Sequence, residues 1–185
     1  MPLKLISLYT QRYVRKCWFT YNLLVSYPRR FFRKARREVR EVLKFFGDED
    51  PRVEKTIVAG LLGVKTCLDV KALIREMREG DGTFIRYTFR WIPVERWVKS
   101  DIDSMKEALE ELASQIEEGE TWRMTVEKRR YGGLHKSEII RELAEVIDRK
   151  VDLENPDKVV MVEIIGGQAG ISVLQPEELF SSRTP

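Results

Sequence analysis

The most constraining feature of the sequence is the run from Val159 to Ile165, which is apolar and largely β-branched, with Glu163 as its one charged residue. Such a run is typical of a strand with little solvent exposure. Pro156 lacks an N–H and cannot lie inside a central strand, so it marks the turn before this one. The glycines at 166–167 allow positive φ, and Ile171–Leu174 is then the expected returning strand of a hairpin.

The N-terminal half alternates strand-like and helix-like patterns. A helix is predicted over 69–79, with Asp69 as a suitable N-cap and Gly80 as its stop. The two short apolar runs before it are expected to be strands joined near Leu62-Gly63. The predicted strands cover 21–26, 53–61, 64–68 and 82–98, and the predicted helices cover 29–46 and 69–79. This β-α-β-β-α-β order is the ferredoxin-like pattern, in the α/β (α+β) class.

The C-terminal half predicts a second α+β unit. Ser100 with Asp103 resembles a capping box at the start of a helix that reaches Ile116. A strand over 121–130 and a helix capped by Ser137 come next, before the hairpin. We expect four segments: a basic N-terminal extension (1–20), a ferredoxin-like domain (21–98), a second domain (99–176) and a flexible C-terminal tail (177–185).

The composition is that of a soluble globular protein, with 43% hydrophobic and 34% charged residues. No apolar run reaches the ~18 residues that a membrane span requires. Cys17 and Cys67 stand far apart without a C-x-x-C pair, so the sequence indicates neither a disulfide framework nor a zinc site. We expect a cytoplasmic protein that contacts no membrane.

Charge is divided unequally along the chain. Residues 1–46 hold 12 Lys and Arg against 2 acids, whereas the remainder holds 21 against 28. Within the predicted helix over 29–46, helical spacing places the cations on the face opposite the apolar one. They are Arg29, Arg33, Arg36, Arg37, Arg40 and Lys44. This row of cations could simply be a solvated surface. However, a row of like charges favours binding of a polyanion, and it therefore predicts nucleic-acid binding.

The predicted strand over 82–98 is rich in aromatic residues. Alternation places Ile85, Tyr87, Phe89 and Trp91 on one face and Arg86, Thr88 and Arg90 on the other. We interpret the aromatic face as core, with base stacking as the alternative. Arg86 and Arg90 are then candidates to line an open sheet face that contacts RNA.

A second basic cluster surrounds the turn before the helix capped by Ser137. It contains Lys128, Arg129, Arg130, His135 and Lys136. Cations beside a helix N-terminus suit a phosphate group, since backbone N–H groups and the helix dipole add to the side-chain charge. An ordinary polar strand end is the alternative interpretation.

Catalytic patterns are absent from the sequence. It holds no G-x-x-x-x-G-K-[ST], no G-x-G-x-x-G after a strand and no H-E-x-x-H. His135 is the only histidine, so no catalytic triad can exist without it. We interpret the glycines of Gly-Gly-Gln-Ala-Gly (166–170) as turn residues and not as a phosphate-binding loop. The sequence thus predicts no enzyme, catalytic residue, metal, cofactor or small-molecule substrate, although an enzyme with an unrecognised site remains an alternative.

The stretches SEIIRELAEVID and VDLENPDKVVMVEII resemble the second half of a THUMP domain, an RNA-binding module. The match includes Asp152, Asn155, Pro156, Asp157 and Glu163. THUMP domains typically follow an N-terminal ferredoxin-like domain, which is the order expected here. The resemblance covers about residues 21–176.

The resemblance also implies a function. The architecture is similar to stand-alone THUMP proteins that act as tRNA-binding adaptors of the RNA acetyltransferase that makes N4-acetylcytidine. It implies tRNA, held by its acceptor end, and that acetyltransferase as partners. A general RNA- or ribosome-binding module serving another tRNA modification enzyme remains the alternative.

Overall fold

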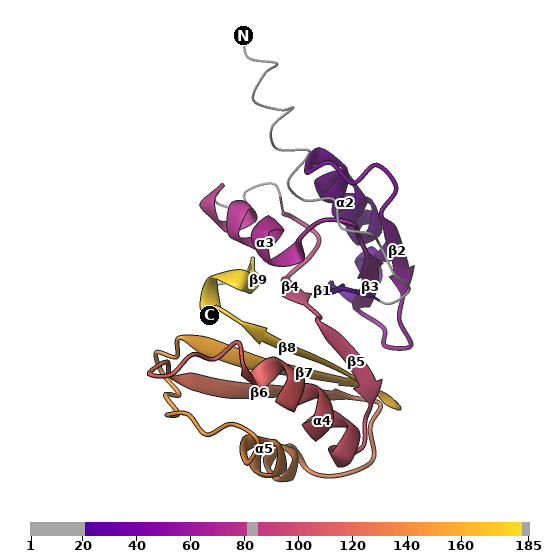
Figure 1. Ribbon diagram of the computed structural model, residues 1–185. Helices are drawn as coiled ribbons and strands as arrows, with labels where there is room; N and C mark the ends of the chain where they lie inside the picture. The colour runs from indigo at the N-terminus through magenta and orange to yellow at the C-terminus, as the bar shows by residue number, and fades with distance from the viewer. Residues whose placement is uncertain (1–20, 81–84, 183–185) are drawn as a thin grey trace. The chain divides into compact units, whose positions relative to one another are not determined.

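The first sheet is antiparallel throughout, with strands in the order β2-β3-β1-β4-β9 (Figure 1). The structure is a computed structural model that describes residues 21–80 and 85–182. The predicted β-α-β-β-α-β order is confirmed, and the sheet order is that of a ferredoxin-like fold. Along the chain come β1 (Leu23–Ser26), α2 (Phe32–Phe45), β2 (Arg52–Lys55), β3 (Leu61–Lys65), α3 (Val70–Glu79) and β4 (Arg90–Pro93).

Helix α2 packs its predicted apolar face into the core of this unit, directly after a single 3-10 turn, η1 (Arg29–Phe31). Ala35, Val39 and Leu43 are fully buried in the same cluster as Val25 and Leu62 of the sheet. The burial of this face anchors the helix and leaves the basic face outward.

The second sheet has the order β5-β8-β7-β6, with β6 and β7 parallel and the other pairs antiparallel. Helices α4 (Ile102–Ala113) and α5 (Lys136–Ala144) cover one of its faces (Figure 1). The strands are β5 (Arg96–Lys99), β6 (Trp122–Arg129), β7 (Lys158–Ile165) and β8 (Gln168–Leu174). Alternate residues of β7, Val160, Val162 and Ile164, share a core with Leu109 of α4 and Leu143 of α5. The predicted buried hairpin is confirmed.

The chain divides into two compact units between Pro93 and Val94 and again between Pro176 and Glu177. The first unit therefore includes the described residues from Glu177 onward. The predicted flexible tail over 177–185 is wrong for its described part, which forms η2 (Pro176–Glu178) and β9 (Phe180–Ser181). Residues 183–185 and the predicted extension over 1–20 lie outside the described residues.

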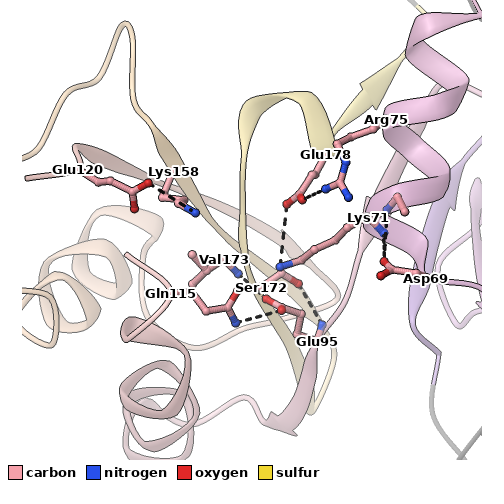
Figure 2. Close-up of polar contacts among 11 residues, drawn as sticks. Asp69, Lys71, Arg75, Glu95, Gln115, Glu120, Lys158, Ser172, Val173 and Glu178 are labelled. Atoms are coloured by element: carbon pink, nitrogen blue, oxygen red, sulfur yellow. Dashed lines mark hydrogen bonds and ion pairs between the residues drawn. The ribbon is translucent and has the colours of Figure 1, made fainter. Parts of the chain in front are cut away.

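Charge and hydrogen bonds hold the C-terminal segment in the first unit. Figure 2 shows the Glu178 carboxylate between Arg75 and Lys71 of α3. Glu178 is only 5% exposed; it pairs with Arg75 and lies 4.0 Å from the Lys71 Nζ. Arg78 donates to the Leu179 carbonyl at 2.7 Å, and β9 pairs with β4. These contacts join the described C-terminal segment to α3 and β4.

The turn between β2 and β3 does not lie near Leu62-Gly63, where the sequence predicted it. Leu62-Gly63 lies inside β3, and the chain turns over 56–60, where Gly60 has φ of 92°. The ring of Tyr21 lies against Gly63, because a Cβ there would be 2.5 Å from it. Gly63 is thus required for close packing, and Gly60 for the turn.

The predicted long strand over 82–98 is also wrong. Residues 85–89 form no strand, β4 ends at Pro93, and β5 belongs to the other sheet. The Glu38 carboxylate explains the irregular start, because it accepts hydrogen bonds from the backbone N–H groups of Arg86 and Tyr87. Trp91 is fully buried, as the core interpretation requires.

Two predicted helix caps shift by two residues or fewer. The N-cap of α4 is Asp101, which accepts from the Ser104 N–H at 2.9 Å, whereas Ser100 donates to the Gly166 carbonyl. The N-cap of α5 is His135, and Ser137 lies exposed in the first turn. The caps of α3, Asp69 and Gly80, are as predicted.

None of the helices within 21–80 and 85–182 has the length and apolar character to cross a membrane.

Candidate nucleic-acid interface

Arginines of η1 and of the basic face of α2 form the first candidate surface, which we call the arginine stripe: Arg29, Arg33, Arg36, Arg37 and Arg40. The first four are exposed and Arg40 is half-buried. Arg36 donates to the Val53 carbonyl at 2.9 Å, and Arg37 lies 3.6 Å from Glu41. Arg29, Arg33 and Arg40 have no ion pair within the described part of the chain. The stripe therefore retains most of its charge.

Acidic residues do little to neutralise this stripe. Residues 29–37 contain no acid, and the next residue, Glu38, is only 8% exposed. Its carboxylate accepts from the N–H of Arg86 at 2.7 Å, the N–H of Tyr87 at 3.0 Å and the hydroxyl of Thr88 at 2.8 Å. Glu38 thus organises the backbone beside α2, and within the described residues it forms no ion pair with the outer arginines.

The structure does not bring Arg86 and Arg90 together on an open sheet face. Arg86 is exposed in the irregular segment that Glu38 holds, whereas Arg90 is half-buried in β4. The Arg90 N–H donates to the Ser26 hydroxyl at 3.1 Å, and β9 covers the neighbouring edge of β4. The predicted alternation fails because residues 85–89 form no strand; Thr88 is consequently buried as well.

The second candidate surface, which we call the turn cluster, lies at the end of β6, in the turn after it and at the start of α5; it comprises Lys128, Arg129, Arg130, His135, Lys136 and Ser137. The Lys128 Nζ donates to the Leu134 carbonyl at 2.6 Å and lies 5.4 Å from the Tyr131 ring, so it closes the turn. Lys136 lies 3.8 Å from a Glu127 oxygen. The structure confirms the proximity of these residues, but several already have partners.

Arg129 has a structural partner that the sequence reasoning missed. Its guanidinium pairs with Glu163 on the parallel neighbour β7, and Glu163 is 1% exposed. An acid inside an apolar strand was the signal, because a buried carboxylate requires a cation or several donors. Arg129 consequently contributes less charge to an external ligand than its exposed neighbour Arg130.

The N-terminus of α5 is also partly occupied. The Glu138 carboxylate accepts from the His135 N–H at 2.7 Å and places a negative charge in the first turn. Arg130, His135, Lys136 and Ser137 are nevertheless exposed. Arg130 adopts a positive φ of 52°, which is uncommon outside glycine and fixes the direction of the turn.

The polar segment before β7 has a structural role. Asp157 accepts from the Thr121 N–H at 2.8 Å and from its hydroxyl at 2.9 Å, and these bonds hold the pKa of Asp157 below its ordinary value. Asp152 accepts from the N–H groups of Glu154 and Asn155. The segment therefore fixes the start of β7 beside the start of β6.

An aromatic group lies beside the arginine stripe, and sequence reasoning did not single it out. The rings of Phe31 and Tyr87 lie 5.5 Å apart between centroids, with planes at 66°. Arg30 and Lys34 contact these rings. Among the described residues no group of three or more His, Cys, Asp or Glu is arranged to hold a metal ion.

Comparison with known proteins finds a family match over the part of the chain that contains the turn cluster. Residues 99–174 match the family model of the THUMP domain. The chain is 26% identical to THUMP domain-containing protein 1 of Homo sapiens over 155 residues, which are 80% of this chain and 43% of that protein. For the Mus musculus protein the identity is 25%, over 80% of this chain and 44% of that protein. The chain therefore spans less than half the length of these relatives.

Solved structures show the same fold at low identity. PH1313 from Pyrococcus horikoshii is similar over 83% of this chain and 54% of its own, with a TM-score of 0.58 and 18% identity. A 4-thiouridine synthetase in complex with RNA and bound ATP is similar over 85% of this chain and 42% of its own, with a TM-score of 0.54 and 17% identity. The predicted resemblance is confirmed: the chain contains a THUMP domain and is homologous to THUMP domain-containing protein 1.

Proposed function

We propose that this protein is a tRNA-binding adaptor that presents tRNA to a separate enzyme, the acetyltransferase that forms N4-acetylcytidine. It acts in the cytoplasm and catalyses no reaction itself. The observation that carries the proposal is the arginine stripe, an exposed line of charge in a chain with a THUMP domain. Such a line attracts the phosphate backbone because bound counter-ions are released.

The comparisons support RNA as the ligand. The similar 4-thiouridine synthetase is known in complex with RNA. Its name also supports a role of this fold in RNA modification, and it favours the alternative that the present protein serves an enzyme other than the acetyltransferase. Whether the partner is the acetyltransferase or another modification enzyme, the first step is the same: the protein binds folded tRNA.

We further propose that the two basic surfaces divide the tRNA between them. The arginine stripe suits duplex backbone, since a line of charge contacts phosphates without reading bases. The turn cluster takes the single-stranded 3′ end, with Arg130, His135 and Lys136 as its exposed side chains. Arg129 supports this site mainly through its pair with Glu163.

The adaptor function is tested in two assays. Filter binding should show tRNA affinity that falls steeply with salt. Purified acetyltransferase with acetyl-CoA, ATP and tRNA should then form N4-acetylcytidine faster when this protein is added, whereas the protein alone should form none. Absence of tRNA binding at low salt would contradict the whole proposal. Binding without stimulation would leave the alternative enzyme partner.

A further inference from the structure

Two aromatic rings at the N-terminal end of α2 form a small, well-defined surface. Phe31 ends η1 and Tyr87 comes from the segment before β4, and both are half-buried. Their planes meet at 66°, with centroids 5.5 Å apart, so the rings form a corner. Tyr87 packs against the core of the unit, which fixes one wall of this corner.

Cations contact both rings. The Arg30 guanidinium carbon lies 4.7 Å from the centre of Phe31. The Lys34 Nζ lies 5.5 Å from the centre of Phe31 and 5.0 Å from that of Tyr87. These distances fall within the range of cation–π attraction. The corner therefore combines flat apolar faces with two positive charges.

Buried hydrogen bonds fix the position of the corner. The Glu38 carboxylate accepts from the Tyr87 N–H, and the Thr88 hydroxyl links it to the Trp91 indole N–H at 3.0 Å. On the other side, the Phe31 N–H donates to the Pro28 carbonyl at 2.8 Å. Both aromatic residues thus have anchored backbones, so little ordering is required when a ligand binds.

An unpaired nucleotide is the ligand that matches this combination. Unstacked RNA bases bind on aromatic rings or on guanidinium planes, and their phosphates bind cations. Arg30 over Phe31 supplies such a plane, and the Lys34 Nζ lies within 5.5 Å of the centres of both rings. Residues 29–37 contain no acid, and the carboxylate of the next residue, Glu38, is buried and accepts hydrogen bonds from the segment 86–88. If these side chains served packing alone, apolar side chains of similar size would suffice, and neither aromatic rings nor adjacent cations would be required.

The location relates this corner to the arginine stripe. The stripe runs along α2, whose 14 residues span ~21 Å, and the corner lies at its N-terminal end. If an RNA duplex lay along the arginine stripe and ended near the N-terminus of α2, an unpaired nucleotide at that end could stack in the corner. We propose that Phe31, Tyr87, Arg30 and Lys34 form a stacking site for an unpaired nucleotide adjoining an RNA duplex. This inference rests on the proposed function, since it assumes that α2 binds RNA.

The test uses the full chain and two RNAs, a blunt duplex and the same duplex with a short single-stranded extension. Phe31→Leu and Tyr87→Leu keep apolar bulk but remove the flat ring. Each should weaken binding of the extended RNA about 5- to 150-fold, since one stacked base contributes about 1–3 kcal/mol. Binding of the blunt duplex and the salt slope should stay unchanged. Phe45→Leu is the matched control, because Phe45 lies at the other end of α2 and is 85% exposed.

A 2-aminopurine in the extension gives a second measurement. Its fluorescence should be quenched on binding wild-type protein and the Phe45→Leu variant, and less on binding Phe31→Leu or Tyr87→Leu. Circular dichroism of each variant excludes unfolding as the cause. Equal affinity of all variants for the extended RNA would overturn the stacking site and leave the adaptor function intact. If wild-type protein bound neither these RNAs nor tRNA, both proposals would be wrong.

Discussion

The arginine stripe and the turn cluster look alike in the sequence but differ in the structure. In the stripe, Arg33 is exposed and has no ion pair within residues 21–80 and 85–182. In the turn cluster, Arg129 pairs with a buried carboxylate, Lys128 closes a turn and Lys136 lies near Glu127. The difference teaches that a count of cations overestimates the charge available to a ligand wherever the cations also maintain the fold.

The largest expected effect separates Arg129 from Arg33. Arg129→Ala should lower the free energy of unfolding by about 3–5 kcal/mol, because Glu163 is then buried without its cation. Arg33→Ala should change it by less than about 0.5 kcal/mol, since an exposed side chain without partners is removed. Urea unfolding measures both. Similar values for the two variants would remove the distinction between the surfaces.

The next effect concerns the other buried acid with cationic partners. Glu178→Ala should lower the free energy of unfolding of the first unit by about 1–3 kcal/mol, because Arg75 and Lys71 lose a shared buried partner. Glu177→Ala is the control, since Glu177 is exposed beside it. Hydrogen exchange should show faster opening of β4 in Glu178→Ala alone. Unchanged exchange would mean that the C-terminal segment contributes little to the first unit.

Within the turn cluster, binding should depend on the exposed residues. Arg130→Ala with Lys136→Ala should weaken binding of intact tRNA about 5- to 10-fold, and binding of tRNA trimmed at its 3′ end much less. The stripe variants should weaken binding of both RNAs alike. Fluorescence anisotropy with the two RNAs measures the difference. Equal losses on both RNAs for all variants would indicate a diffuse basic surface without division.

The smallest effect is the pH dependence from Asp157. Its folded pKa is below the ordinary value of 3.8, because Thr121 donates two hydrogen bonds to the carboxylate. The stabilisation is therefore complete above 3.8 and is lost as pH falls through the lower folded pKa. Thr121→Val removes the hydroxyl bond and should reduce this acid dependence of unfolding. An identical pH profile for the variant would contradict the assignment.

Much of the fold could be predicted from the spacing of apolar residues and from the positions of proline and glycine. The buried run of β7 and its hairpin were evident from β-branched residues between Pro156 and two glycines. Tertiary contacts decided what local patterns could not. Glu38 removes residues 85–89 from a strand that alternation predicts, and the ring of Tyr21 explains Gly63 inside β3. Both contacts join residues far apart in sequence.

The candidate site was predictable to a similar degree. The arginine stripe required only helical spacing, so its exposure was anticipated. The partner of Arg129 required the register between β6 and β7, which no local pattern provides. The corner of Phe31 and Tyr87 joins two elements more than fifty residues apart in sequence, and so it became visible only in the structure.

The most direct test of the central claim is the salt dependence of tRNA binding by the wild-type protein and by the Arg33→Ala, Arg40→Ala double variant. Each lost phosphate contact should reduce the slope of log affinity against log salt by about 0.7–0.9. We therefore predict a slope shallower by about 1–2 and weaker binding at low salt, with the free energy of unfolding nearly unchanged. A wild-type affinity that does not vary with salt, or a double variant with the wild-type slope, would contradict the claim that the exposed arginine stripe binds tRNA.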